Sequence, residues 1–135
     1  MKTNMYLNLP VKDLGKSTTF FEKLGFTINP QFTGENASSM VVNENIIIML
    51  LQEKFFQTFI KKSVCDAKNN TEVLIGLSAE TRDEVNTLVD IAIKAGGTTY
   101  SDPVDHGWMY QRSFADLDGH QWEIFYMDIN AMPKQ

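Results

Sequence analysis

The sequence predicts an α+β fold in which two tandem β-α-β-β-β modules form an open, barrel-like curved sheet with a concave pocket. The spacing of apolar residues gives this order of elements twice along the 135 residues. Residues recur as well, since Val11, Gly25 and Pro30 have counterparts near Leu77, Gly96 and Pro103. One module alone cannot easily close a core, so we expect the two to pack together as a single domain with their helices outside.

The first module is expected over residues 1–52. Apolar residues alternate along Met5–Val11, which is typical of a strand with one buried face. Asp13 can cap a helix over residues 14–24 because its side chain accepts backbone hydrogen bonds, and Gly25 suits the left-handed residue that ends a helix. Three further strands are expected at 26–32, 37–42 and 46–51.

Residues 53–70 are expected to join the modules. Phenylalanine and isoleucine residues at helical spacing predict a helix over 53–62, and the polar stretch 63–70 reads as a linker. This stretch is therefore the predicted boundary between the two halves.

The second module is expected over residues 71–128, before a tail at 129–135. A strand at 71–79 precedes Thr81 and Glu84, which form a capping-box pattern at a helix start. That helix should end at Gly96 and Gly97. A short strand at 98–101 and a loop at 102–107 then lead into the last two strands.

Those two strands, Met109–Ala115 and Gln121–Met127, flank an Asp-Gly pair, which favours a β-hairpin because glycine tolerates the positive φ of such turns. Side chains alternate along a strand, so Glu123 shares one face with Gln121 and Phe125. A carboxylate among large apolar residues is a candidate for proton transfer or ligand binding. Glu123 is the first candidate catalytic residue.

Composition excludes several function classes. The net charge of -5 and the scattered lysines offer no basic surface for nucleic acid. The longest apolar run, at 46–51, is too short to span a bilayer, and the first ten residues lack the apolar core of a cleavable signal. Cys65 is the single cysteine, so it can form no intrachain disulfide. We therefore expect a cytoplasmic protein whose partner is a small molecule.

Two segments carry a resemblance to a known family. Residues 9–26 (LPVKDLGKSTTFFEKLGF) and 114–128 (FADLDGHQWEIFYMD) resemble the sequence patterns of the vicinal oxygen chelate superfamily, at the same relative positions. This superfamily includes glyoxalase I, extradiol dioxygenases, and the bleomycin and fosfomycin resistance proteins. The resemblance implies paired β-α-β-β-β modules, a pocket in the concavity of the sheet and a homodimer.

The resemblance also implies a divalent metal, held by a His on the first strand of each module and by a carboxylate on the last strand of one or both. Glu123 falls on the carboxylate position of the second module, so it is the candidate metal ligand. Tyr6 occupies the first His position, and Met49 lies near the first carboxylate position. In the second module Glu72 stands as far before Leu77 as Tyr6 stands before Val11, so Glu72 alone could replace the missing His.

Further candidates come from the predicted faces of the strands. His106, in the loop before the hairpin, can exchange protons near neutral pH and is a candidate catalytic residue; otherwise it is a solvated loop residue. Candidate substrate-binding residues on strands of the first module are Tyr6, Asn8 and Met49. Met49 could form an apolar wall with Phe125 and Trp108.

Tyr110 and Arg112 share one face of the first hairpin strand and are also candidate substrate-binding residues. If that face is the interior, Arg112 would bind an anionic group of the substrate or pair with Glu123. If it is the exterior, Arg112 is a surface charge, and Gln111 and Ser113 face the pocket instead. Alternation alone does not choose between the two faces.

Two functions follow as hypotheses. The first is an enzyme similar to glyoxalases or dioxygenases, acting on a small oxygen-bearing molecule with Glu123 as base or metal ligand. The alternative is a ligand-sequestering protein similar to the bleomycin resistance proteins, whose acidic surface attracts a cationic drug.

Overall fold

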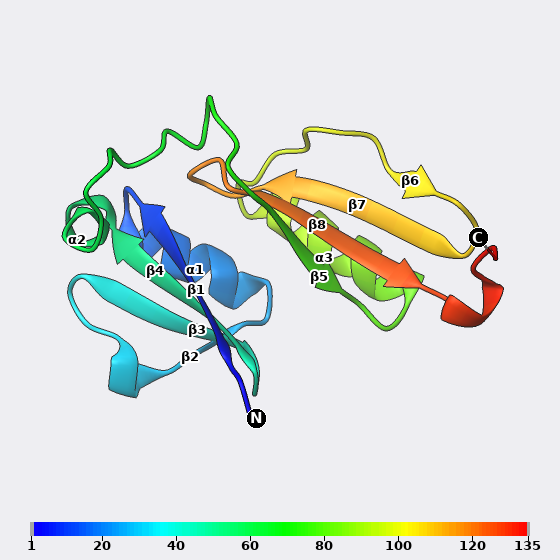
Figure 1. Cartoon of the computed structure of the whole chain (residues 1–135), viewed down its shortest axis with the longest axis horizontal. Helices are drawn as coiled ribbons and strands as arrows, with labels where there is room; N and C mark the ends of the chain where they lie inside the picture. Colours follow the sequence, from blue (N-terminus) through cyan, green and yellow to red (C-terminus); the bar gives the residue numbers. More distant parts are fainter. Residues whose placement is uncertain (1, 135) are drawn as a thin grey trace. The chain divides into compact units, whose positions relative to one another are not determined.

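The computed structural model describes residues 2–134, which divide into two compact units between Asp66 and Ala67. Each unit contains one four-stranded sheet with a helix on one of its faces (Figure 1). The predicted α+β class and the repeated β-α-β-β-β order are confirmed. Each sheet has two free edges and twisted strands, so neither closes on itself as a barrel.

Unit 1 has the strand order β1-β4-β3-β2, in which β1 runs parallel to β4 and the other pairs are antiparallel. Its elements are β1 (Met5–Val11), α1 (Leu14–Lys23), β2 (Thr27–Ile28), the 3-10 turn Pro30–Phe32, β3 (Ala37–Asn43), β4 (Ile46–Gln52) and α2 (Glu53–Gln57). The helix α1 contacts β3 and β4. Its Phe20 and Phe21 are buried beside Met40, Ile48 and Leu50 of these strands.

Both ends of α1 form as the sequence predicts. The Asp13 carboxylate accepts a hydrogen bond of 3.0 Å from the Lys16 N–H, which satisfies one of the backbone donors left over at a helix start. Gly25 follows the last turn with a φ of 98°, a conformation that glycine adopts without a steric penalty. These two signals fix the helix between β1 and β2.

Unit 2 has the equivalent strand order β5-β8-β7-β6, with β5 parallel to β8. Its elements are β5 (Leu74–Ser78), α3 (Arg82–Lys94), β6 (Val104–Asp105), β7 (Met109–Ala115), β8 (Gln121–Met127) and the 3-10 turn Ile129–Ala131. The helix α3 packs on β7 and β8, and the core between them holds Val85, Val89, Ala92, Phe114, Trp122 and Ile124. The two predicted hairpin strands are confirmed at both of their ends.

The predicted cap of α3 is also confirmed. The Thr81 hydroxyl accepts from the Glu84 N–H at 3.1 Å, and the Glu84 carboxylate accepts from the Glu80 N–H at 2.7 Å. The carboxylate therefore reaches one residue further back than in the usual capping box, where the N–H of the cap residue itself is the donor.

Several predicted boundaries are wrong. The strand expected at 26–32 shortens to β2, because Pro30 has no N–H for a sheet and instead begins a 3-10 turn. The helix expected at 53–62 ends at Gln57. The strand expected at 98–101 is reduced to one bridge between Thr98 and Ala115, while β6 forms inside the predicted loop.

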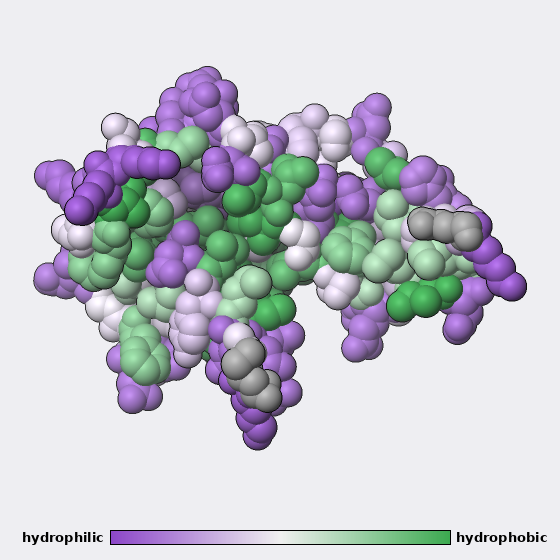
Figure 2. Space-filling model, in the orientation of Figure 1, coloured by the Kyte–Doolittle hydropathy of each residue, from purple (hydrophilic) through white to green (hydrophobic). Residues whose placement is uncertain are grey.

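The surface drawn in Figure 2 mixes hydrophilic and hydrophobic side chains over both units. Among residues 2–134, no helix has the length and apolar character needed to cross a lipid bilayer.

Candidate functional site

Glu123 lies at the centre of the face of unit 2 that α3 leaves uncovered. On β8 the neighbouring side chains of Trp122 and Ile124 are buried, at 0% and 1% exposure, so they point to the helix side. Glu123 points the other way. The strand register places it between Gly76 of β5 and Ser113 of β7.

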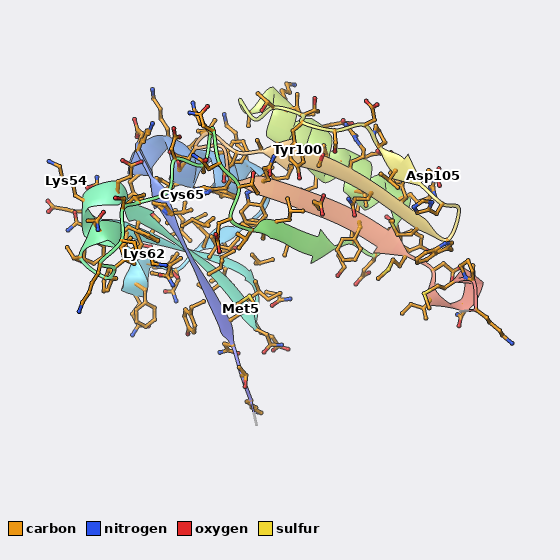
Figure 3. All side chains as sticks on the ribbon, turned by 45° about the horizontal axis from the view of Figure 1, so that its top comes forward. Met5, Lys54, Lys62, Cys65, Tyr100 and Asp105 are labelled. Atoms are coloured by element: carbon orange, nitrogen blue, oxygen red, sulfur yellow. The ribbon has the colours of Figure 1, made fainter. Side chains whose placement is uncertain are left out.

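Tyr100 is a neighbour of Glu123 that the sequence did not indicate. It belongs to the connection between α3 and β7 (Figure 3), where the Thr98 bridge to Ala115 sets it beside β7. Its hydroxyl donates a long hydrogen bond of 3.4 Å to the Trp122 carbonyl. Burial raises the pKa of the Tyr100 phenol, and the negative charge of Glu123 raises it further. The phenol and the carboxylate are therefore close enough to interact electrostatically.

Phe125 lies on the other side of Glu123. A Cβ atom built on Gly76 would stand 3.4 Å from Cε1 of Phe125, so the ring leans over the glycine. An added Cβ at position 76 would be in van der Waals contact with this ring. The strand register agrees with the prediction that Glu123 and Phe125 lie on the same face of the sheet. Phe125 thus lies on the β5 side of the Glu123 carboxylate, and Tyr100 lies on its β7 side.

Tyr110 and Arg112 lie on the opposite face of the sheet, which corrects the prediction that they line the site with Glu123. Arg112 pairs in register with Ile124, on the side covered by α3. Its guanidinium donates to Asn86 at 3.1 Å and to Asp90 at 2.8 Å. Gln111 and Ser113 consequently share the face of Glu123, as the second of the two predicted arrangements requires.

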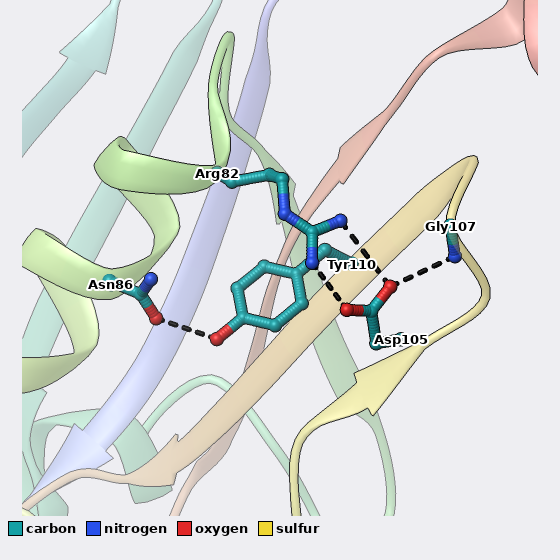
Figure 4. A network of polar contacts seen from close by, with 5 residues as sticks. All are labelled: Arg82, Asn86, Asp105, Gly107 and Tyr110. Carbon is teal, nitrogen blue, oxygen red and sulfur yellow. Dashed lines mark hydrogen bonds and ion pairs between the residues drawn. The ribbon is translucent and has the colours of Figure 1, made fainter.

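Figure 4 shows the polar network in which Tyr110 takes part. Its hydroxyl donates to the Asn86 side chain at 2.7 Å, and the Arg82 guanidinium lies 4.4 Å from the centre of its ring. Arg82 also forms an ion pair with Asp105, and the Gly107 N–H donates to the same carboxylate. The hydrogen bond with Arg82 is the main cause that lowers the pKa of Asp105. This network attaches β6 and the following loop to α3.

His106 is not brought together with Glu123. Its N–H donates to the Met109 carbonyl, and Met109 is four residues along β7 from Ser113, or about 13 Å at the rise of a strand. The imidazole is exposed and stacks on Trp108, with ring centres 6.3 Å apart. Its predicted catalytic role therefore has no support from its position within unit 2.

Tyr6, Asn8 and Met49 lie together in unit 1, on the face of the sheet away from α1. Asn8 pairs with Met49, which pairs with Ser39, so this row of three corresponds to Gly76, Glu123 and Ser113 in unit 2. Met49 is thus the counterpart of Glu123, as expected from the sequence. The Tyr6 side chain is 57% exposed.

The same comparison shows that the counterpart of Tyr6 in unit 2 is Leu74, not Glu72 as predicted from the sequence. Tyr6 stands seven residues before the helix cap Asp13, and Leu74 stands seven residues before the cap Thr81. Leu74 therefore occupies the second His position of the superfamily. Glu72 lies before β5 begins and is exposed, so it does not replace the missing His.

In neither unit do the residues at the implied metal positions fit a divalent metal. They are Tyr6 and Met49 in unit 1, and Leu74 and Glu123 in unit 2, of which only Glu123 is a carboxylate or imidazole ligand. Within residues 2–134, no group of three or more His, Cys, Asp and Glu side chains is arranged to hold a metal ion. Glu123 on its own supplies one ligand of the several that a stable site needs.

A second acidic residue near the hairpin turn has a structural role. Asp116 is 7% exposed and accepts three hydrogen bonds of 3.0 Å, from the Trp122 indole and from the Asp118 and His120 backbone N–H groups. Burial is the main cause that raises its pKa. Its oxygens are occupied in holding the turn, which leaves Glu123 as the carboxylate available on this part of the sheet.

Comparison with known proteins agrees with this fold. Residues 3–43 match a family model described as bleomycin resistance protein-like N-terminal. No curated protein sequence matches the chain. A hypothetical protein from S. aureus is 32% identical, with a TM-score of 0.79 over 93% of this chain and 94% of that one.

Two less similar structures share the fold. One is a glyoxalase/bleomycin resistance protein/dioxygenase family enzyme from Burkholderia phytofirmans PsJN, 18% identical with a TM-score of 0.75 over 91% of this chain and 97% of that one. The other is a fosfomycin resistance protein from Mesorhizobium loti, 12% identical with a TM-score of 0.69 over 96% of each chain. The repeated modules, the family model matched by residues 3–43 and the fold shared with these structures agree with the resemblance to the vicinal oxygen chelate superfamily.

Proposed function

We propose that the chain binds a small organic cation on the Glu123 face of unit 2 and holds it without chemical change, similar to the ligand-sequestering bleomycin resistance proteins. The observation that carries this proposal is the half-buried Glu123 carboxylate between the aromatic side chains of Tyr100 and Phe125. A carboxylate attracts a cation by charge, and the faces of aromatic rings attract it through their quadrupoles. The net charge of -5 favours the approach of a cation from solution.

Binding is favoured over metal-assisted catalysis by the chemistry of the ligand positions. Tyr6, Met49 and Leu74 stand where the superfamily resemblance implies two imidazoles and a second carboxylate. A phenol, a thioether and an aliphatic side chain are poor ligands for a hard divalent ion. The match of residues 3–43 to a bleomycin resistance protein-like family supports the same proposal.

The test is a thermal-shift titration with bleomycin, spermidine and tetramethylammonium, each measured with and without EDTA. A cation that binds the folded state at about 100 times its Kd stabilises this chain by about 2.7 kcal/mol, or about 9 °C in Tm. We expect a shift with at least one of these cations, unchanged by EDTA. A shift that disappears in EDTA would contradict the metal-free part of the proposal.

Two variants separate the site from the overall charge. Glu123→Gln removes the carboxylate at nearly constant shape, whereas Glu72→Gln removes the same charge from an exposed position outside the strands. Loss of an ion pair in this half-buried site should weaken binding about tenfold or more in Glu123→Gln. Binding should persist in Glu72→Gln. Equal losses in the two variants, or no cation that binds, would overturn the proposal.

A second candidate is a metal-independent enzyme in which Glu123 acts as a general base. The observation that favours it is the proximity of the Tyr100 phenol, a proton donor whose pKa is raised by burial and by the charge of Glu123. It is distinguished from simple binding by recovering the bound molecule. An unchanged ligand after long incubation supports sequestration, and a product that forms with the wild type but not with Glu123→Gln supports catalysis.

A further inference from the structure

A separate cavity lies at the turn end of the β7–β8 hairpin in unit 2. Its volume is about 470 Å³, which is within the range of small-molecule sites. The linker residues 67–71 form one wall, and the start of the connection that carries Tyr100 forms the other. Ala115 and Gln121, the residues that end β7 and begin β8, also line it. Glu123 does not line this cavity.

Both walls are attached to the hairpin. On one side, a Cβ atom built on Gly119 would stand only 2.8 Å from the Ala67 carbonyl oxygen, so the linker backbone passes directly over the turn. The Thr71 hydroxyl then donates to Oε1 of Gln121 at 2.8 Å. On the other side, Thr98 and Ala115 exchange two backbone hydrogen bonds, of 3.0 and 2.7 Å. The hairpin therefore fixes the position of both walls of the cavity.

The polar groups around the cavity are mostly uncharged. Amide, hydroxyl and phenol groups come from Asn69, Asn70, Thr71, Thr98, Tyr100 and Gln121. Because Gln121 uses its oxygen as the acceptor for Thr71, its amide N–H groups can be offered to a ligand. The Tyr100 ring adds an aromatic surface beside them.

The two charged residues in the lining disfavour charged ligands. Asp116 would repel an anion, yet its oxygens already accept three hydrogen bonds and so have little capacity left for a cation. Lys68, in the linker wall, would repel a cation. The remaining class that fits is an uncharged molecule with several hydrogen-bonding groups.

We propose that this cavity is a binding site for a small uncharged polar molecule, of the polyol or primary-amide class. The cavity shares Tyr100 with the proposed cation site, whereas Glu123 does not line it. Gln121 and Tyr100 are the residues that would contact the ligand.

The test is a series of 1H–15N correlation spectra during titration with myo-inositol, glucose and nicotinamide, with acetate and methylammonium as charged comparisons. We expect saturable shifts of the backbone signals of 67–71, 96–100 and 115–121 with at least one uncharged probe. The charged probes should give weaker or unsaturated changes at these signals. Saturation by a charged probe at equal or lower concentration, or by none of the uncharged ones, would overturn the proposal.

Two variants test where in unit 2 the uncharged probes bind. Gln121→Met keeps the length of the side chain but removes its amide, so it should weaken probe binding about tenfold. Gln111→Met makes the same change four residues along β7 from Ala115 and should leave binding intact. The uncharged probes and the cations are titrated separately, so a failure here is distinguishable from a failure of the proposed cation site. Equal affinity in Gln121→Met and the wild type would contradict the assignment.

Discussion

Asp116 is the residue whose replacement tests the structure of the hairpin turn most directly. Its two carboxylate oxygens accept from one buried indole N–H and from two backbone N–H groups, each at 3.0 Å. In Asp116→Ala all three donors lose their acceptor. The two backbone donors belong to the partly exposed residues Asp118 and His120, which water can reach, but Trp122 is 0% exposed.

The expected decrease in the free energy of unfolding follows from the loss of the acceptor for these three donors. An unsatisfied buried donor costs about 1–3 kcal/mol, and a hydrogen bond to a charged group contributes about 1.5–3 kcal/mol. We therefore expect Asp116→Ala to lower the free energy of unfolding by about 3 kcal/mol. Asp116→Asn keeps one acceptor but turns an N–H₂ group toward another donor, so it should lose about 1–2 kcal/mol. Because typical domains are stable by about 5–15 kcal/mol, both losses are large enough to measure.

Urea unfolding followed by far-UV circular dichroism measures these differences, with Asp102→Asn as the control. Asp102 is an exposed carboxylate of the same unit, so its variant carries the same change of charge without the buried contacts. A loss in Asp116→Ala no larger than that in Asp102→Asn would refute the structural role of Asp116.

The pH dependence of the same measurement gives an independent check. Burial raises the pKa of Asp116 above the ordinary value that it has in the unfolded chain. Folding therefore favours the protonated form, and the resulting stability is fully present below the unfolded pKa and lost as the pH rises through the folded pKa. The wild type should accordingly gain stability relative to Asp116→Asn as the pH falls through this range. A constant difference between the two proteins would contradict the raised pKa.

Two further substitutions test other contacts. Gly119→Ala should destabilise unit 2 by about 2 kcal/mol or more, because Gly119 has a φ of 93° and an added Cβ would stand 2.8 Å from the linker backbone. Urea unfolding measures this loss of stability. Limited proteolysis of the variant should also show faster cleavage at residues 67–70. Tyr110→Phe should lose about 1 kcal/mol with its 2.7 Å hydrogen bond to Asn86. Because Tyr110 lies on the helix side, cation binding should be unchanged, and a tenfold loss of affinity would place it in the site after all.

The sequence predicts best where local signals agree with the tertiary structure. Both strands of the last hairpin have the predicted ends, because alternation and the Asp-Gly turn determine the same register. The helix α1 is bounded by Asp13 and Gly25 as expected. Pro30, in contrast, interrupts an apolar segment that otherwise resembles a strand, and its missing N–H decides the outcome.

The candidate site is predicted less completely than the fold because its neighbours come from non-local pairing. Tyr100 reaches Glu123 only because Thr98 bridges to Ala115, and no local pattern signals that bridge. The local sequence also does not show which face of the sheet carries Arg112, because polar residues occur on both faces of β7. Its partners Asn86 and Asp90 are on α3, more than twenty residues earlier in the chain, so only the packing of that helix selects the side.

The connection between α3 and β7, which supplies Tyr100, is held in two physically different ways. Near Thr98 it is fixed by backbone hydrogen bonds, which added salt does not screen. At Asp105 it is held by the backbone pairing of β6 with β7 and, in addition, by an exposed ion pair with Arg82, whose attraction weakens as ionic strength increases. Added salt therefore removes part of the attraction that holds the far end of this segment, whereas the backbone hydrogen bonds near Tyr100 are unaffected. The aromatic wall beside Glu123 should accordingly depend less on ionic strength than the far end of its own segment.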